Sequence, residues 1–300
     1  MRSRLFIIFL CALATAIPAR VTAQSARDVP WRSLDVAGLR RSYLLRVPAP
    51  AEPSRALPLL LVFHGAGGDA AGIERHTGLT AAATARGYAV VYPEGIGHRL
   101  NDGRGIVSTD DLGFIRTLLD SLRAVLPVDP RRIYATGISN GGGMSFRLAC
   151  DLPGTFAAIA PVAGPLAATL EEQCSATRPV SLVMFQGTRD PLMPYDGGVL
   201  TSRRGSVLAA PRIFELFARV DGCGGAAVLT AEPDTVTDGT RVRRSSYPEC
   251  RDGHDVVLFT IEGGGHTWPG GPPVGSAVGR VTRDLDATRV LLDFFDRHPQ

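Results

Sequence analysis

The sequence predicts an α/β protein with a doubly wound, mostly parallel sheet and helices on both faces. Short continuous apolar runs, such as residues 59–63 and 180–185, suit strands that are buried on both faces of a parallel sheet. Stretches of helical character alternate with these runs along the chain. We find no internal repeat or long low-complexity linker, so we expect a single domain over residues 24–300.

Residues 1–23 have the form of a secretory signal peptide. Arg2 and Arg4 precede an apolar segment at residues 5–17, and small residues at 21–23 stand before a cleavage position. The apolar segment is short for a transmembrane helix, so an uncleaved anchor is the weaker alternative. We therefore expect a secreted protein, extracellular or periplasmic, that keeps no stable membrane anchor after cleavage.

The composition is that of a soluble globular protein, with 45% hydrophobic and 20% charged residues. The formal net charge is +3 at pH 7, and the signal segment carries three arginines and no acidic residue. The mature chain is therefore near neutral, which gives no electrostatic reason to expect nucleic acid as a partner. The sequence contains no lysine, so lysine is excluded as a base, nucleophile or phosphate ligand.

Proline and glycine delimit the first elements. A strand at residues 41–47 follows a leader or edge segment at residues 24–39. Four prolines make residues 48–58 a turn-rich connection. The buried strand at residues 59–63 ends in a glycine-rich loop, and a glycine closes the helix that follows at residues 70–86.

The middle of the chain predicts a long loop between two further strands. The strand at residues 88–92 leads into a polar, glycine-rich loop at residues 94–108. Two aspartates stand in the first turn of the next helix, residues 109–126, where carboxylates favour a helix N-terminus. Two prolines end that helix before a short strand at residues 133–135 and a helix at residues 144–149.

The second half continues the alternation around a glycine- and arginine-rich segment at residues 191–211, which we interpret as a cap or lid. A variable segment ending at residue 178 separates the first two strands of this half, at residues 157–162 and 180–185. The remaining expected elements are strands at residues 157–162, 180–185, 240–247 and 256–261 and helices at residues 212–220 and 282–297.

A G-x-S-x-G motif occupies residues 137–141, between the strand at residues 133–135 and the following helix. Strand, sharp turn and helix is the context of a nucleophile elbow, in which a strained backbone projects the serine hydroxyl. Glycines on either side of the serine avoid collisions with the neighbouring strand and helix. A chance motif is the alternative in a chain with 34 glycines. The sequence predicts Ser139 as a catalytic nucleophile.

A serine nucleophile needs a base, and after an elbow of this kind the chain order is serine, acid, histidine. Three histidines follow Ser139. His266 lies in a glycine-rich loop after the strand at residues 256–261, where a catalytic imidazole is held. His254 lies in a polar turn, and His298 lies near the C-terminus. His266 is the predicted base, with His254 as the main alternative.

The orienting acid is expected after the preceding strand. Asp190 follows residues 180–185 through a short turn and is the predicted acid. Asp196 and Asp221 are its rivals, and pairing with Arg189 is the structural alternative for Asp190.

Two backbone amides should form an oxyanion hole. The amide of Asn140 is the first, and the amide of Ala66 is the second, with Gly67 as the alternative. Trp268 lies two residues after the predicted base, and Asn101 lies in the loop after a sheet strand, so both are candidate substrate contacts. A packed tryptophan and a solvated loop are the structural alternatives for these two residues.

Four of the five cysteines lie outside the signal segment, and an even number in an exported chain suggests disulfides. Four cysteines allow three connectivities. We favour Cys150–Cys174 and Cys223–Cys250, because each pair brackets one local loop. No spacing of cysteine and histidine suggests zinc, so no metal is expected.

Four runs together resemble a known family. They are H-G-A-G-G from His64, G-I-S-N-G-G from Gly137, G-T-R-D-P-L-M-P-Y from Gly187 and E-G-G-G-H-T-W-P-G-G from Glu262. They look like the secreted poly(3-hydroxybutyrate) depolymerase and feruloyl esterase-type enzymes, which have the α/β-hydrolase fold. The resemblance extends from about residue 39 to the C-terminus, and the histidine run is its most distinctive part.

The resemblance implies a serine carboxylic ester hydrolase without a cofactor, acting on hydroxyalkanoate or feruloyl-type esters through Ser139, Asp190 and His266. It also implies the amides of Ala66 and Asn140 as the oxyanion hole. The alternatives are a peptidase of the same fold and a non-catalytic binding module of that fold. An intact order of serine, aspartate and histidine argues against the binding module.

Two positions depart from the pattern of that family. Ala66 stands where a cysteine is frequent, and a backbone donor survives that change. In the helix after the serine, the family often has a bulky methionine directly after the position of Gly142. Here Gly143 intervenes before Met144. Glycine in a first helical turn costs up to about 1 kcal/mol of helix propensity.

Overall fold

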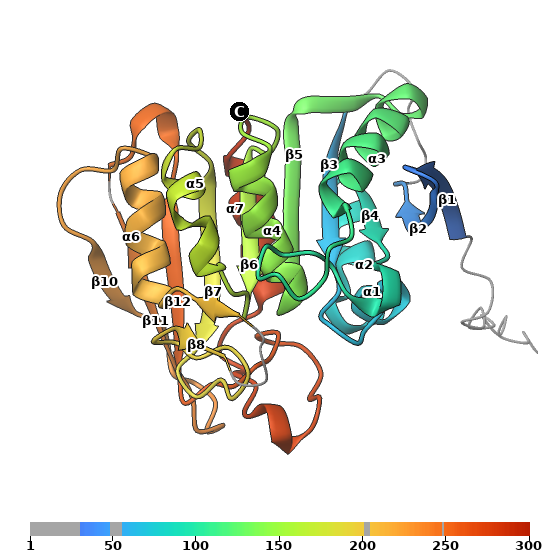
Figure 1. Cartoon of the computed structure of the whole chain (residues 1–300). Coiled ribbons are helices and arrows are strands. Elements are labelled where there is room, and N and C mark those ends of the chain that lie inside the picture. Colours follow the sequence, from blue (N-terminus) through green and yellow to red (C-terminus); the bar gives the residue numbers. More distant parts are fainter. Residues whose placement is uncertain (1–30, 49–55, 201–204, 248) are drawn as a thin grey trace, which may run out of the picture.

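A ten-stranded sheet is the centre of the molecule, seen in the computed structural model of Figure 1. The structure describes residues 31–48, 56–200, 205–247 and 249–300, so the expected signal peptide lies outside the described residues. The strand order is β1-β2-β4-β3-β5-β6-β7-β12-β11-β10. The strands are β1 (Trp31–Val36), β2 (Leu39–Arg46), β3 (Leu57–Phe63), β4 (Ala89–Pro93), β5 (Val128–Ile138), β6 (Ala158–Val162), β7 (Ser181–Gly187), β10 (Val228–Ala231), β11 (Arg241–Ser246) and β12 (Val256–Glu262).

The inner strands from β4 to β12 pair in parallel, and antiparallel pairs flank them at both edges. At one edge β1 pairs with β2, and at the other β10 pairs with β11. The carboxyl ends of the parallel strands therefore meet at one edge of the sheet, which lies at the bottom of Figure 1. Loops from distant parts of the sequence gather there.

Helices cover both faces of the sheet (Figure 1). Leu59 and Leu61 of β3 share a core with Phe114, whereas Leu60 and Val62 of the same strand share another core with the helices of the opposite face. This alternation confirms the doubly wound sheet with helices on both faces. The helices of the first face are α3 (Asp111–Val125), α4 (Asn140–Asp151), α5 (Glu171–Ser175) and α6 (Ala210–Val220), and those of the second are α1 (Ala70–Thr77), α2 (Leu79–Thr84) and α7 (Ala287–Arg297).

The described helices include none with the length and apolarity needed to cross a bilayer. The expected single helix at residues 70–86 is two helices, because Gly78 has a left-handed backbone (φ 63°) that ends α1. The helix expected from residue 282 begins at Ala287, where Asp286 caps it by accepting from the amide of Arg289 at 3.1 Å.

Several short elements were not expected from the sequence. Strand β1 forms the sheet edge within the predicted leader segment, and β10 carries mostly exposed residues that give no apolar alternation. Helix α5 lies in the segment interpreted as variable. In the cap segment, residues 198–199 and 206–207 pair as the hairpin β8–β9, while residues 201–204 lie outside the described residues.

Two disulfides join the cysteines in the favoured pairing. Cys150 at the end of α4 is bonded to Cys174 of α5, and Cys223 after α6 is bonded to Cys250. The sequence separations are 24 and 27 residues. Each bridge therefore closes one local loop, as the sequence suggested.

Candidate active site

Ser139 lies at the sharp turn between β5 and α4. Its backbone has φ 59° and ψ −122°, a conformation that is strained for a residue other than glycine. Neighbouring groups hold this strain, because the Ser139 amide donates to Val162 O and its carbonyl accepts from Gly143 N, both at 2.9 Å. A side chain at Gly141 would collide with the carbonyl oxygen of Phe63. The glycine therefore lets the turn approach the end of β3.

The imidazole of His266 is hydrogen-bonded to Asp190, with 2.7 Å between Nδ1 and Oδ2. The other carboxylate oxygen of Asp190 accepts from the amides of Leu192 and Met193 at 2.7 and 2.8 Å. Because the carboxylate accepts at both oxygens, Nδ1 of His266 is the donor and Nε2 remains an acceptor. This tautomer is the one that a general base requires.

Glycines let the loops after β7 and β12 approach one another. A Cβ atom at Gly187 would lie 2.5 Å from the carbonyl oxygens of Gly264 and Gly265. A Cβ atom at Gly265 would collide with the carbonyl oxygen of Val278. The same carbonyl accepts from the amide of His266 at 2.6 Å. The glycines at positions 187 and 265 therefore allow the His266 loop to lie close to Asp190.

Ser139 and His266 line one cavity of about 290 Å³, at the small end of the range for ligand pockets. Its apolar walls are Ile73, Ile138, Leu192, Val274 and Val278. His76 also lines it, and burial lowers the pKa of that imidazole below its ordinary value of 6.5. Apart from Ser139 and His266, the wall therefore offers aliphatic surface, the imidazole of His76, which is neutral at neutral pH, and the polar residues His64 and Asp69.

The loop after β3 lies against the serine, since a Cβ atom at Gly65 would be 3.4 Å from Cβ of Ser139. The amide of Gly67 is occupied, because it donates to His98 O at 2.8 Å. Within the described part of the chain, the amide of Ala66 donates to no protein group. This difference favours Ala66 over Gly67 as a donor to a ligand.

The amide of Asn140 opens α4 and has no partner within the helix, as expected for a first helical turn. Buried His64 holds the neighbouring loop, because Nδ1 donates to Gly65 O at 2.8 Å and Nε2 accepts from Gly95 N at 3.0 Å. His64 therefore has a structural role in positioning the loop backbone.

The side chain of Asn140 fastens the elbow to the loop after β4. Its Nδ2 donates to Asp102 Oδ2 at 2.7 Å and to Leu100 O at 2.8 Å, and its Oδ1 accepts from Leu100 N at 2.8 Å. Arg104 also donates to Asp102, at 2.6 Å, and both side chains are only 3% exposed. This network could not be predicted from the sequence, since charged residues in a polar loop are usually solvated.

The two candidate substrate contacts, Trp268 and Asn101, are not among the residues that line the Ser139 cavity. Trp268 is 1% exposed and its Nε1 donates to Thr288 Oγ1 at 3.0 Å, so the indole is part of the core. The side chain of Asn101 donates to Thr109 O at 3.0 Å and stabilises its own loop. In both cases the hydrogen-bonding group of the side chain has a partner within the protein.

The rival residues have partners elsewhere. His254 contacts Ser181 Oγ at 3.1 Å, and His298 contacts Asp255 at 3.0 Å. Asp221 is fully buried and accepts from the amide of Val180 at 3.0 Å. These residues are absent from the lining of the Ser139 cavity.

Comparison with known proteins places this geometry in a context. Residues 41–223 match the family described as "Esterase PHB depolymerase". "Putative esterase NocK" of Nocardia uniformis subsp. tsuyamanensis is 37% identical over 281 residues, 88% of this chain and 81% of that protein. "Feruloyl esterase B" of Piromyces equi is 33% identical over 235 residues, 75% of this chain but only 42% of that protein.

Among solved structures, the acetyl xylan esterase from Aspergillus awamori is similar with a TM-score of 0.56 and 15% identity. The match covers 79% of this chain and 94% of that one. A thermostable esterase has a TM-score of 0.50 at 20% identity, over 64% of this chain and 52% of that one. These likenesses show a shared fold.

Proposed function

We propose that the chain, which belongs to the family of PHB depolymerase esterases and is a carboxylic ester hydrolase, acts through a catalytic triad. The proposed triad is Ser139, Asp190 and His266. The observation that carries this proposal is the opening of a strained serine and a carboxylate-bound histidine onto one cavity. Such a triad is recognised by geometry and roles.

The proposed reaction has two acyl-transfer steps. His266 Nε2 accepts the hydroxyl proton of Ser139 while the serine oxygen attacks the ester carbonyl carbon. The amides of Ala66 and Asn140 stabilise the oxyanion of the tetrahedral intermediate. His266 then donates the proton to the leaving alcohol, and an acyl-enzyme remains on Ser139. Water, deprotonated by His266, attacks the acyl-enzyme and releases the acid and the free serine.

The proposed substrate is an ester with a small, mostly aliphatic acyl group, with hydroxyalkanoate oligomers as the first candidate. Support comes from the aliphatic walls of the cavity and its volume of about 290 Å³. His76 offers a neutral hydrogen-bonding group for a substrate hydroxyl. Feruloyl-type esters are the second candidate, favoured by the names of relatives such as feruloyl esterase B. Secretion, predicted from residues 1–23, fits either extracellular substrate.

The test compares the mature protein with Ser139→Ala on p-nitrophenyl acetate and butyrate, methyl ferulate and 3-hydroxybutyrate oligomers. Wild type is expected to hydrolyse the preferred ester, and the variant should lose about 10³-fold or more in turnover. A phosphonate probe should label Ser139 of the wild type alone, as seen by peptide mass spectrometry. Equal turnover in both proteins, or labelling at another residue, would contradict the triad.

A further inference from the structure

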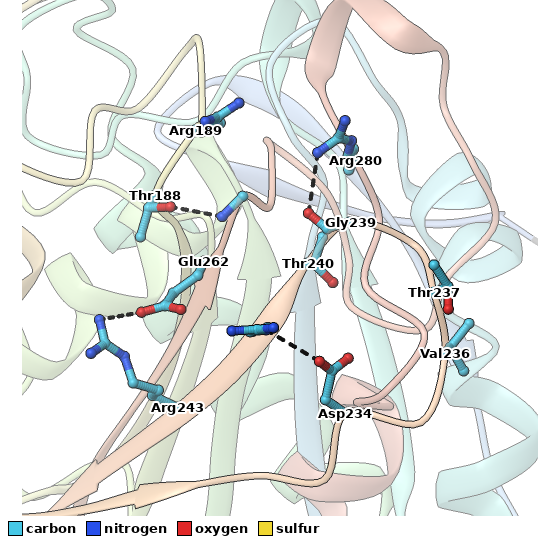
Figure 2. Close-up of a pocket in the computed structure, with 12 residues that line it drawn as sticks. Thr188, Arg189, Asp234, Val236, Thr237, Gly239, Thr240, Arg243, Glu262 and Arg280 are labelled. Atoms are coloured by element: carbon cyan, nitrogen blue, oxygen red, sulfur yellow. Dashed lines mark hydrogen bonds and ion pairs between the residues drawn. The ribbon is translucent and has the colours of Figure 1, made fainter.

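A second pocket, larger than the Ser139 cavity, lies at the ends of β7 and β12. Figure 2 shows its lining residues, and its volume is about 740 Å³. It is formed where the ends of β7 and β12 meet the segment that enters β11 and the stretch around Arg280. Its walls are polar, with hydroxyl groups from Thr188, Thr237 and Thr240. In chemistry it differs from the aliphatic cavity at the serine.

Arginines dominate the charge of this pocket. Asp234 pairs with Arg241 at 3.2 Å, and Glu262 pairs with Arg243. Two more arginines, Arg189 and Arg280, line the pocket, and both lie in the upper part of Figure 2.

Those two arginines keep an uncompensated charge. Arg280 Nη1 donates to the carbonyl of Gly239 at 3.1 Å. In the described ranges of the chain, no carboxylate forms an ion pair with Arg189 or Arg280. The pocket therefore has a net charge of about +2 at neutral pH, because guanidinium groups stay protonated.

Both arginines lie on the segments that separate the two cavities. The amide of Arg189, next to Asp190, donates to Gly264 O at 2.9 Å. The carbonyl of Arg280 accepts from Gly265 N at 3.0 Å, and Val278, two residues earlier, lines the Ser139 cavity. Arg189 therefore lies three residues before Leu192, and Arg280 two residues after Val278, and both Leu192 and Val278 line the Ser139 cavity.

We propose that Arg189 and Arg280 bind the terminal carboxylate of an oligomeric ester whose scissile bond lies at Ser139. An oligomer of ester-linked hydroxy acids carries one negative charge, at its carboxyl end. Cleavage of an internal ester transfers the acyl part to serine and leaves an alcohol that still bears this carboxylate. The aliphatic cavity thus receives the acyl side and the arginine pocket receives the leaving side. The inference rests on the proposed hydrolysis of such esters.

Arginine is suited to this task because its planar fork forms paired hydrogen bonds with a carboxylate. Arg241 and Arg243 already have the carboxylate partners Asp234 and Glu262, so the two remaining arginines are the groups available to an anion. Exposure of the pocket to solvent makes the attraction sensitive to ionic strength. The expected preference for a free acid over its neutral ester is about ten-fold at low salt.

The experiment measures kcat/KM for 3-hydroxybutyrate oligomers of graded length, each as the free acid and as the methyl ester. Wild type should prefer the free acid about ten-fold once the oligomer is long enough to span both cavities. Arg189→Gln/Arg280→Gln should bring this ratio close to one. Arg123→Gln, at the last turn of α3, is the matched control and should keep the wild-type ratio.

A ratio near one at every length in the wild type, or an unchanged ratio in the double variant, would overturn the proposal. Calorimetric binding of both oligomer forms to Ser139→Ala separates it from the proposed function. Tighter binding of the free acid that the double substitution removes supports the arginine pocket, even if wild type does not hydrolyse the oligomer. Equal binding of both forms overturns the pocket while leaving esterase activity intact.

Discussion

The side-chain amide of Asn140 donates to the carboxylate of Asp102 at 2.7 Å, immediately behind the turn that carries Ser139. The backbone amide of the same asparagine is a proposed donor to the oxyanion. One residue thus joins the elbow to the loop after β4 through its side chain and faces the substrate through its backbone. The carboxylate of Asp102 also neutralises buried Arg104.

Asp102→Asn should destabilise the protein by about 3–5 kcal/mol, because Arg104 would remain buried without a counter-charge. Looser support of the elbow should also lower kcat more than it raises KM. Urea unfolding and steady-state kinetics check both effects. Asp120→Asn is the control, since Asp120 is 78% exposed, and should change stability by less than about 0.5 kcal/mol. Equal unfolding midpoints for the two variants would contradict a stabilising role for Asp102.

Asp190→Asn should reduce kcat by on the order of 10³–10⁴-fold with little change in the fold. The amides of Leu192 and Met193 require an oxygen acceptor, so the new NH₂ group would face His266. The imidazole would then accept at Nδ1 and carry its proton on Nε2, which cannot act as a base. Kinetics over a range of pH, with circular dichroism as the folding control, test this. Retention of more than about a tenth of the activity would be inconsistent with Asp190 as the orienting acid.

Gly141→Ala should cost at least about 1–3 kcal/mol of stability or prevent folding, because its methyl group would collide with the carbonyl of Phe63. Gly224→Ala is the matched control, because the nearest atom to its added Cβ lies 3.9 Å away. Chemical denaturation measures both variants. The argument for close approach at the elbow fails if the two substitutions have the same effect.

Stability should fall as the pH rises from about 4 to about 7, owing to Asp221. Burial of this carboxyl raises its pKa from 3.8 to about 7. The folded protein therefore holds the proton more tightly than the unfolded chain, and the resulting stabilisation is lost as the pH rises through the folded pKa. The contribution is about 4 kcal/mol for a shift of this size.

Asp221→Asn should flatten this dependence, because the amide does not titrate and keeps an oxygen for the amide of Val180. Calorimetric melting of wild type and variant from about pH 4 to about pH 8 compares how their stabilities depend on pH. The upper limit lies about one unit above the folded pKa of Asp221. Asp120→Asn, at an exposed position, should reproduce the wild-type slope. A variant at position 221 with the wild-type slope would assign the pH dependence to other groups.

The order of strands and helices could be predicted from the sequence because buried parallel strands are continuous apolar runs, as in β3 and β7. Candidate roles for Ser139, Asp190 and His266 followed from motif and chain order, and they remain proposals until tested. Strand β10 was missed because its residues are mostly exposed and carry no periodic signal. Gly78 was read as part of a helix because glycine is merely unfavourable there, not excluded.

The tertiary networks could not be predicted because they join residues that are distant in sequence. Nothing near Trp268 indicated that Thr288, 20 positions later, would bind its indole and draw it into the core. The arginine pocket likewise combines side chains from positions 189 to 280, whose proximity depends on the pairing of β7, β12 and β11. Periodicity describes which side chains are buried, but not which distant polar groups they meet.

Because Trp268 is buried, the fluorescence of its indole reports the folding of the protein. The chain has two tryptophans, one 1% exposed in the core and the other, Trp31, 48% exposed on the edge strand. Unfolding moves the first indole from an apolar environment into water and changes the environment of the second much less. A red shift in emission should therefore report loss of the core near the His266 loop, without any attached label.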